Sequence, residues 1–299
     1  MSAITGPRLW FELVSHELEI AIRSRRVAGV AVLYLLIATA AGYGGVRAIE
    51  AATEAVVSAT SAQVGAPEEA TRAALESAST PMLESVLSGL GIDVDEISPA
   101  LKSSPLVAGF FLGSLFLLPW LVAFASFDAI SADLASRSLC YETLKISRVE
   151  LLLAKFVALL VLLLCVTTAC GIAILGVGLT RLTGLDFGDV ARGGARSLAA
   201  LVPYTAAYLA LTLVCSAATR TPIFALVANV ALRTVLGIAD HWSDSPGPAR
   251  FLSLASPGRY DLGLWHVPGT SLAISVAAYC AITAVALAAT ATLLRRRDL

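Results

Sequence analysis

Six long apolar stretches dominate this chain and leave few choices for its fold. They lie at roughly 27–46, 105–127, 156–178, 197–218, 222–239 and 269–294. Each is close to the roughly 20 residues that an α-helix needs to cross the hydrocarbon core of a bilayer. The sequence therefore predicts an all-α polytopic membrane protein with six transmembrane helices, in which residues 1–299 form a single transmembrane domain.

The composition supports a membrane location and excludes two other classes. Of the 299 residues, 57% are hydrophobic and only 14% are charged, whereas a soluble domain carries about a quarter charged residues. The net charge of −1 provides no basic surface for nucleic acid. Four of the five cysteines lie inside apolar stretches and none lies in the two long polar loops, so no disulfide framework is predicted.

Basic residues next to the first and last stretches set the predicted orientation. Three arginines precede the first stretch and three follow the last one: Arg23, Arg25, Arg26, Arg295, Arg296 and Arg297. Lys and Arg concentrate on the cytoplasmic side of membrane proteins. We therefore expect a multi-pass protein of the bacterial plasma (inner) membrane with both termini in the cytoplasm. The loop with Arg181, Arg192 and Arg196 then falls outside, against this rule; the two basic termini decide the orientation.

Three polar segments complete the predicted layout. Residues 8–26 alternate apolar and charged positions at helical spacing, which predicts an interfacial helix that leads into the first span. Residues 47–104 are acidic and contain few helix breakers, so we expect an external insertion of two or three helices between spans one and two. Residues 240–268 are predicted to form an external loop.

The sequence contains no recognisable catalytic motif. It lacks a G-x-x-x-x-G-K-[ST] phosphate loop, a G-x-S-x-G nucleophile elbow, an H-E-x-x-H motif and a C-x-x-C pair. His241 and His266 share an acidic external loop, where solvated side chains are a better interpretation than a metal site. We therefore predict no enzyme activity, no cofactor and no metal in this chain.

Charged residues cluster between the second and third spans, at residues 128–155. Asp133 and Arg137 are four residues apart, and Glu142 and Lys145 are three apart, so each pair shares one helix face. On spacing alone, a solvated hairpin is a sufficient explanation.

This segment also resembles the corresponding region of ABC-2-type transporter permeases. Matching positions are Ile130, Ser131 and Asp133, then Ser138 and Leu139, then Ser147, Arg148, Leu151, Leu152 and Lys155. The stretch "ELEIAIRSRR" before the first span, "LASPGRYDLGLW" before the last one and the final "LLRRRDL" resemble the same family. Ala132 and Ala154 depart from it, since glycine is usual at both positions.

The resemblance implies a half-transporter that works with a separate ATP-binding-cassette ATPase and a second permease copy, as a homodimer or with a related half. Residues 128–155 would be the cytoplasmic coupling segment on which the ATPase acts. The implied ATPase contacts are Asp133, Arg137, Glu142, Lys145 and Arg148. Residues 240–268 resemble the short re-entrant helices that cap the transport path in this family.

Arg233 is the one cation within the apolar stretches, where a charge is costly. Asn229 lies one turn before it on the same helix face. In the family, spans two and five line the path at the dimer axis, so Trp120, Asn229 and Arg233 are candidate path residues. The alternatives are that Arg233 snorkels to the membrane surface, and that the aromatic residues around Trp120 serve packing or lipid contact.

Three functions remain open from the sequence. The first is the permease subunit of an ATP-driven exporter. The second is an ATPase-coupled membrane subunit that transmits force through residues 47–104 to an extracytoplasmic partner, without transport. The third, a secondary transporter, requires ionisable sites in mid-membrane, and no Asp or Glu lies inside the six stretches.

Overall fold

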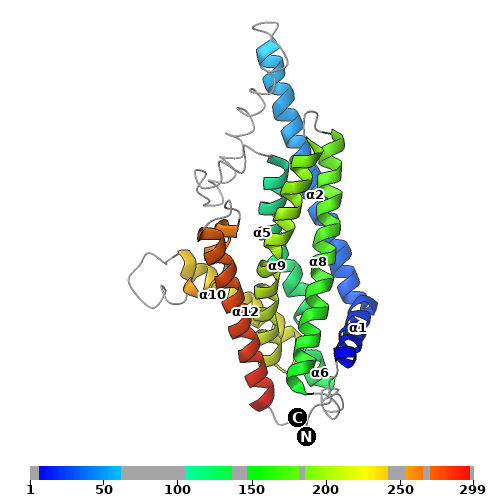
Figure 1. The fold of residues 1–299 in the computed structure, drawn as a ribbon, viewed down its shortest axis with the longest axis vertical. Coiled ribbons are helices and arrows are strands. Elements are labelled where there is room, and N and C mark those ends of the chain that lie inside the picture. Colours follow the sequence, from blue (N-terminus) through cyan, green and yellow to red (C-terminus); the bar gives the residue numbers. More distant parts are fainter. Residues whose placement is uncertain are drawn as a thin grey trace.

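The structure is a computed structural model that describes residues 7–61, 105–136, 147–181, 186–241, 253–264 and 270–296. Within these ranges the regular elements are all helical (Figure 1). The long helices are α1 (Pro7–Arg23), α2 (Arg25–Ser61), α5 (Pro105–Ser126), α8 (Arg148–Arg181), α9 (Phe187–Ala218), α10 (Pro222–His241) and α12 (Thr270–Arg296). The short ones are α6 (Ser131–Ser136), η1 (Pro257–Tyr260) and η2 (Leu262–Leu264).

Six helical segments are long and apolar enough to cross a membrane: Arg25–Gly44, Leu106–Ser136, Arg148–Arg181, Phe187–Ala218, Pro222–Asp240 and Thr270–Arg296. The prediction of an all-α protein with six spans is therefore confirmed for the described residues. Most of the predicted external insertion, residues 62–104, and most of the predicted external loop lie outside them.

Three helices are longer than hydropathy alone predicts. Ser147 and Glu150 form a reciprocal cap at the start of α8, in which the Glu150 amide donates to Ser147 Oγ at 3.2 Å and the Ser147 amide donates to Glu150 Oε2 at 3.1 Å. The Asp189 amide donates to Asp186 Oδ2 at 3.1 Å at the start of α9. At its other end, α2 continues to Ser61, beyond its membrane-crossing part.

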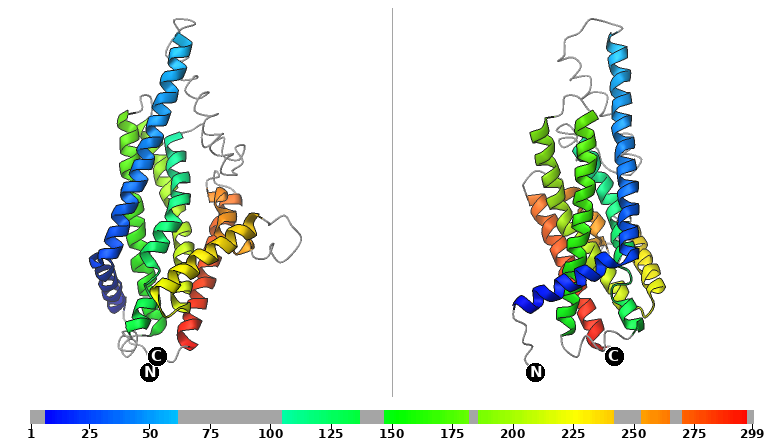
Figure 2. Two further views of the ribbon diagram at one scale, coloured as in Figure 1. Left: turned by 180° about the vertical axis from the view of Figure 1, so that it is seen from behind. Right: turned by 90° about the vertical axis from the view of Figure 1, so that its right-hand side faces the viewer.

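The helices form an elongated bundle around α9. This helix packs against α5, α8, α10 and α12. The start of α1 and the end of α12 lie at the same end of the bundle, called the terminal end below, and α2 projects past the opposite end (Figure 1). α10 crosses the bundle obliquely, and α1 lies at a steep angle to α2 (Figure 2).

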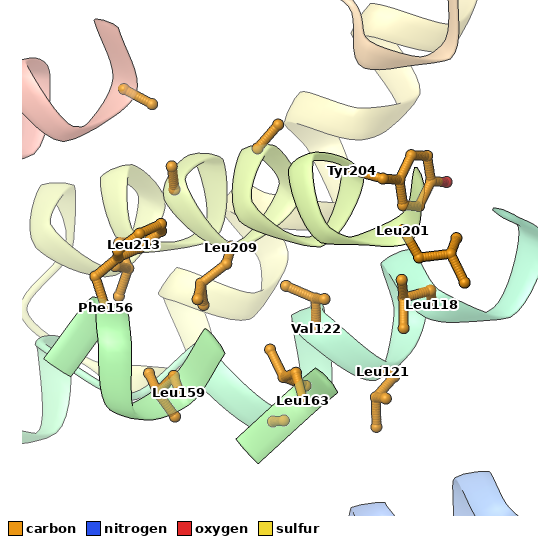
Figure 3. Packing of buried hydrophobic residues seen from close by; sticks show 14 of the residues in the cluster. Leu118, Leu121, Val122, Phe156, Leu159, Leu163, Leu201, Tyr204, Leu209 and Leu213 are labelled. Carbon is orange, nitrogen blue, oxygen red and sulfur yellow. The ribbon is translucent and has the colours of Figure 1, made fainter. Parts of the chain in front are cut away.

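The core lies where α5, α8 and α9 meet. Leu118, Val122, Leu163, Leu201 and Leu209 are almost completely buried there and interdigitate (Figure 3). A Cβ at Gly178 of α8 would come within 2.2 Å of the Leu106 side chain on α5. The two helices therefore approach more closely at this position than a larger residue would allow.

α1 presents apolar side chains outward at the terminal end. Phe11 and Ile22 are largely exposed, while Leu13 and Ala21 pack against the core. The break between α1 and α2 falls at Ser24, whose amide still donates to the Ile20 carbonyl at 3.0 Å. Exposed apolar residues beside charged ones are typical of a helix in the headgroup layer, and this location of α1 stays a prediction.

Ser216 of α9 holds the chain where α5 gives way to α6. Its fully buried Oγ accepts hydrogen bonds from the amides of Ile130 at 3.1 Å and Ser131 at 3.0 Å. Amides at the start of a helix have no partner within that helix. A residue more than eighty positions away in the sequence therefore fixes the first residues of the charged segment.

We expect Ser216→Ala to lower stability by about 1–3 kcal/mol, because it leaves two buried amides without an acceptor. The measurement is the thermal midpoint of the purified protein in detergent. Ser114→Ala is the matched control, since Ser114 Oγ donates only to the Phe110 carbonyl of its own helix and its loss strands no donor. Equal midpoints for the two variants would contradict this role of Ser216.

Candidate functional site

A cavity of about 260 Å³ lies between α5, α9, α10 and the η1 segment. Its wall includes Trp120 from α5, Tyr208 from α9, and Asn229 and Arg233 from α10. Asp240, at the end of α10, lies in the same wall. These α10 residues are at positions i, i+4 and i+11, which share one face of a helix.

Arg233 turns into this cavity and is held from two sides. Its Nε donates to Asn229 Oδ1 at 2.8 Å, and Asn229 Nδ2 donates to Thr212 Oγ1 on α9 at 2.7 Å. The guanidinium carbon lies 5.0 Å from the centroid of the Tyr208 ring, within the range of a cation–π contact. Arg233 therefore makes its described contacts with α9 and with Asn229 of its own helix.

The two terminal nitrogens of Arg233, Nη1 and Nη2, are buried and have no hydrogen-bond partner among the described residues. Buried polar groups are almost always paired in folded proteins. A guanidinium whose two terminal nitrogens lack partners among the described residues is therefore an unusual feature that calls for a specific explanation.

The opposite end of the cavity is acidic. Ser256 Oγ donates to Asp240 Oδ2, while Asp240 Oδ1 is buried without a partner among the described residues. The Asp261 carboxyl forms a hydrogen bond with the hydroxyl of Tyr279 on α12, and that hydroxyl also donates to the Pro257 carbonyl at 2.9 Å. These contacts tie the segment after α10 to α12.

Burial raises the pKa of Asp261 to about 8, and the nearby Asp240 adds to the shift. A tyrosine hydroxyl has a single proton to donate. Both contacts of Tyr279 are satisfied when Asp261 is protonated, because Asp261 then donates to the hydroxyl and the hydroxyl donates to Pro257. The neutral acid is thus the form that fits this geometry.

The structure brings together the three candidate path residues of the sequence, Trp120, Asn229 and Arg233. Sequence reasoning missed Tyr208 and Asp261, and it placed Asp240 outside the spans, whereas α10 continues through Asp240. The 11-residue separation of Asn229 and Asp240 was the available signal, since it is close to three helical turns.

The structure describes both ends of the charged segment, residues 128–136 and 147–155, and the charged side chains there have contacts within the subunit. Lys155 Nζ lies 2.9 Å and 3.0 Å from the two carboxylate oxygens of Glu17 on α1, and 3.1 Å from Asp133 Oδ2 on α6. Arg148 Nη1 donates to the Leu294 carbonyl near the end of α12 at 2.6 Å. Asp133 and Arg148 thus have contacts inside the subunit, while Arg137, Glu142 and Lys145 lie outside the described residues.

These contacts join four helices at the terminal end. Glu17, Asp133 and Lys155 connect α1, α6 and α8, and Arg26 of α2 forms an ion pair with Asp128 in the turn that follows α5. These ion pairs and hydrogen bonds link elements at both ends of the charged segment. They hold both flanks of the charged segment against the bundle, so that a displacement of the segment would act on several helices.

A family model described as ABC-2 family transporter protein matches residues 11–299. The match therefore includes all six apolar helices, the cavity around Arg233 and the charged segment. No curated protein matches the chain.

Proposed function

Because the chain belongs to the ABC-2 family of transporter proteins, we propose that it is the permease subunit of an exporter whose ATP is hydrolysed by a separate ABC ATPase. The family match over residues 11–299 is the observation that carries this proposal. The absence of a phosphate-binding loop from the sequence agrees with hydrolysis by a partner. The terminal end of the bundle is then the cytoplasmic end.

The proposed ATPase contact is the segment at residues 128–155. Arg137, Glu142 and Lys145 are the proposed direct contacts, since charged residues at an interface set its register. Asp133 and Arg148 were grouped with them from the sequence, but their contacts with Lys155 and the Leu294 carbonyl support a positioning role. They would orient the segment for the ATPase from inside the subunit.

The proposed transport path includes the cavity lined by Trp120, Asn229 and Arg233. A second permease copy is expected to complete it. Phe116 on α5 and Ile223 and Phe224 on α10 are each about two-thirds exposed or more, so these helices offer apolar surface to lipid or to such a copy.

One observation favours the second candidate function, transmission of force to an extracytoplasmic partner. The membrane-crossing part of α2 ends at Gly44, yet the helix continues to Ser61 and projects beyond its neighbours (Figure 1). A continuous helix can transmit displacement across the membrane surface. A secondary transporter is disfavoured by the family, even though Asp240 lies within the fifth span.

We expect the chain to co-purify with an ABC ATPase from the same cell and to change its rate of ATP hydrolysis. In the proposed interface, Glu142→Lys combined with Lys145→Glu should weaken co-purification at least tenfold, because like charges would then face each other across the interface. Within an isolated helix the same exchange costs at most about 0.5 kcal/mol.

The matched control exchanges Asp189 and Arg192, an exposed pair three residues apart at the start of α9, at the end of the bundle opposite to the terminal end. That variant should bind the ATPase as the wild type does. Unchanged binding and hydrolysis after the Glu142 and Lys145 exchange would move the interface elsewhere, for instance to α1. Failure of the wild-type chain to bind any ABC ATPase would refute the permease function.

A further inference from the structure

The guanidinium of Arg233 has open hydrogen-bond donors inside a cavity. Only Nε is used, by Asn229, while Nη1 and Nη2 have no partner among the described residues. These two nitrogens carry four N–H groups. Leaving a charged donor buried without a hydrogen-bond partner costs free energy. An acceptor on a bound ligand would remove this cost by accepting from Nη1 and Nη2.

The acids of the same cavity do not fill this role. Asp240 lies seven residues farther along α10, about 10 Å along the helix axis, and its Oδ2 accepts from Ser256. Asp261 is bonded to Tyr279. The bond from Nε to Asn229 draws the guanidinium toward the start of α10, away from Asp240.

The guanidinium is also held in place before any ligand binds. Thr212 fixes Asn229, Asn229 fixes Nε, and the Tyr208 ring lies against the cation. A donor group that is already oriented loses less conformational freedom when it binds a ligand. The terminal nitrogens of arginine match the two oxygens of a carboxylate or phosphate, which accept two parallel hydrogen bonds.

The cavity offers an apolar surface next to this cation. Leu115, Pro119, Leu232 and Leu236 contribute to its wall, as do Phe116 and Trp120. Phe116 is 66% exposed and Trp120 is 43% exposed. The cavity is therefore open along the exposed side chains of Phe116 and Trp120 on α5.

Given that the chain is a permease, we propose that Arg233 is the receptor for the oxyanion, a carboxylate or a phosphate, of an amphiphilic substrate. The apolar part of the substrate lies along Phe116 and Trp120. The acidic end of the cavity at Asp240 repels an oxyanion, so that the ligand binds with its anionic group at Arg233. The proposal depends on the permease function only because it calls the ligand a substrate. Binding of an oxyanion by Arg233 can be tested without the ATPase.

The test uses the full chain purified in a neutral maltoside detergent and two brominated probes of equal length, bromododecanoate and bromododecanol. Bromine quenches tryptophan fluorescence, and Trp120 lines the cavity; the difference between the wild type and Trp120→Phe isolates its signal. We expect the carboxylate to bind about tenfold more tightly than the alcohol, as for a hydrogen bond to a charged group.

Variants at Arg233 assign the preference to its side chain. Arg233→Gln should abolish it, Arg233→Lys should retain part of it because the charge remains without the planar fork, and Arg192→Gln, an exposed arginine far from the cavity, should retain all of it. Equal binding of the two probes by the wild type would overturn the proposal even if Arg233→Gln does not fold. A folded Arg233→Gln protein that still prefers bromododecanoate over bromododecanol as strongly as the wild type does would also overturn the proposal.

Two further arms identify the source of the oxyanion. In nanodiscs, stronger quenching by brominated phosphatidate than by brominated phosphatidylcholine would support a lipid headgroup as the ligand. Displacement of bromododecanoate by millimolar inorganic phosphate would support a soluble anion at the same receptor. A carboxylate preference without a co-purifying ATPase would preserve the receptor and refute the permease function, so the two failures are distinguishable.

Discussion

Lys155→Met should destabilise the protein by about 3–5 kcal/mol, the usual cost of removing one partner from a buried ion pair. The side chains of Lys155 and Glu17 are only 12% and 9% exposed, and Asp133 contacts the same ammonium group. Without the lysine, two carboxylates face each other in a largely buried site. The thermal midpoint in detergent should fall by on the order of 10 °C.

Neutralising the acids should restore most of the loss. In the Lys155→Met protein, Glu17→Gln combined with Asp133→Asn removes the two stranded charges, and replacing a complete buried ion pair by neutral groups is often nearly neutral for stability. Arg192→Met is the control, since it breaks a pair whose side chains are 83% and 66% exposed and should cost under about 1 kcal/mol. Equal midpoints for Lys155→Met and Arg192→Met would show that the network does not stabilise α1 on the bundle.

The six spans could be predicted because burial in lipid demands long apolar helices, which any hydropathy window detects. Their ends were less accurate for a physical reason. Ser147, Glu150 and Asp186 are polar, yet they extend α8 and α9 by capping free amides. The S-x-x-E spacing of a capping box was readable in the sequence, and it would have placed the start of α8 correctly.

The candidate site was predictable only within single helices. Asn229 and Arg233 could be paired because residues four apart share a helix face. The contacts of Arg233 with Tyr208, and of Lys155 with Glu17, join helices that are distant in sequence. Helical periodicity shows which face a residue occupies but does not show which helix lies opposite, so these partners required the structure.

One face of α9 contacts both the cavity around Arg233 and the start of α6. Tyr208 and Thr212 contact the Arg233 and Asn229 side chains of the cavity, and Ser216 binds the start of α6. These three residues recur every four positions, within about 12 Å along the axis. The same face of α9 therefore holds both the side chains of the cavity and the start of α6.

Asp261→Asn should stabilise the protein at pH 8 relative to the wild type, and much less at pH 5. Burial raises the pKa of Asp261 from 3.8 to about 8, so the folded chain keeps a proton that the unfolded chain releases near pH 4. The contribution of this group to the free energy of unfolding is therefore fully present below about pH 4. It falls by about 1.4 kcal/mol for each pH unit as the pH rises from about 4 toward 8. The groups around the carboxyl that respond to its charge are Tyr204 and Tyr208 on α9, Asp240 on α10 and Tyr279 on α12.

Asparagine is uncharged at every pH and can donate to Tyr279 as the protonated acid does, so the variant lacks this pH-dependent loss. The measurement is the difference in thermal midpoint between variant and wild type at pH 5, 6.5 and 8, and it should grow steadily with pH. Asp189→Asn removes one exposed carboxylate from the start of α9 and serves as the control for the change in net charge. A difference that stays constant across this range would mean that Asp261 is ionised throughout, and that Tyr279 donates to its carboxylate instead of to the Pro257 carbonyl.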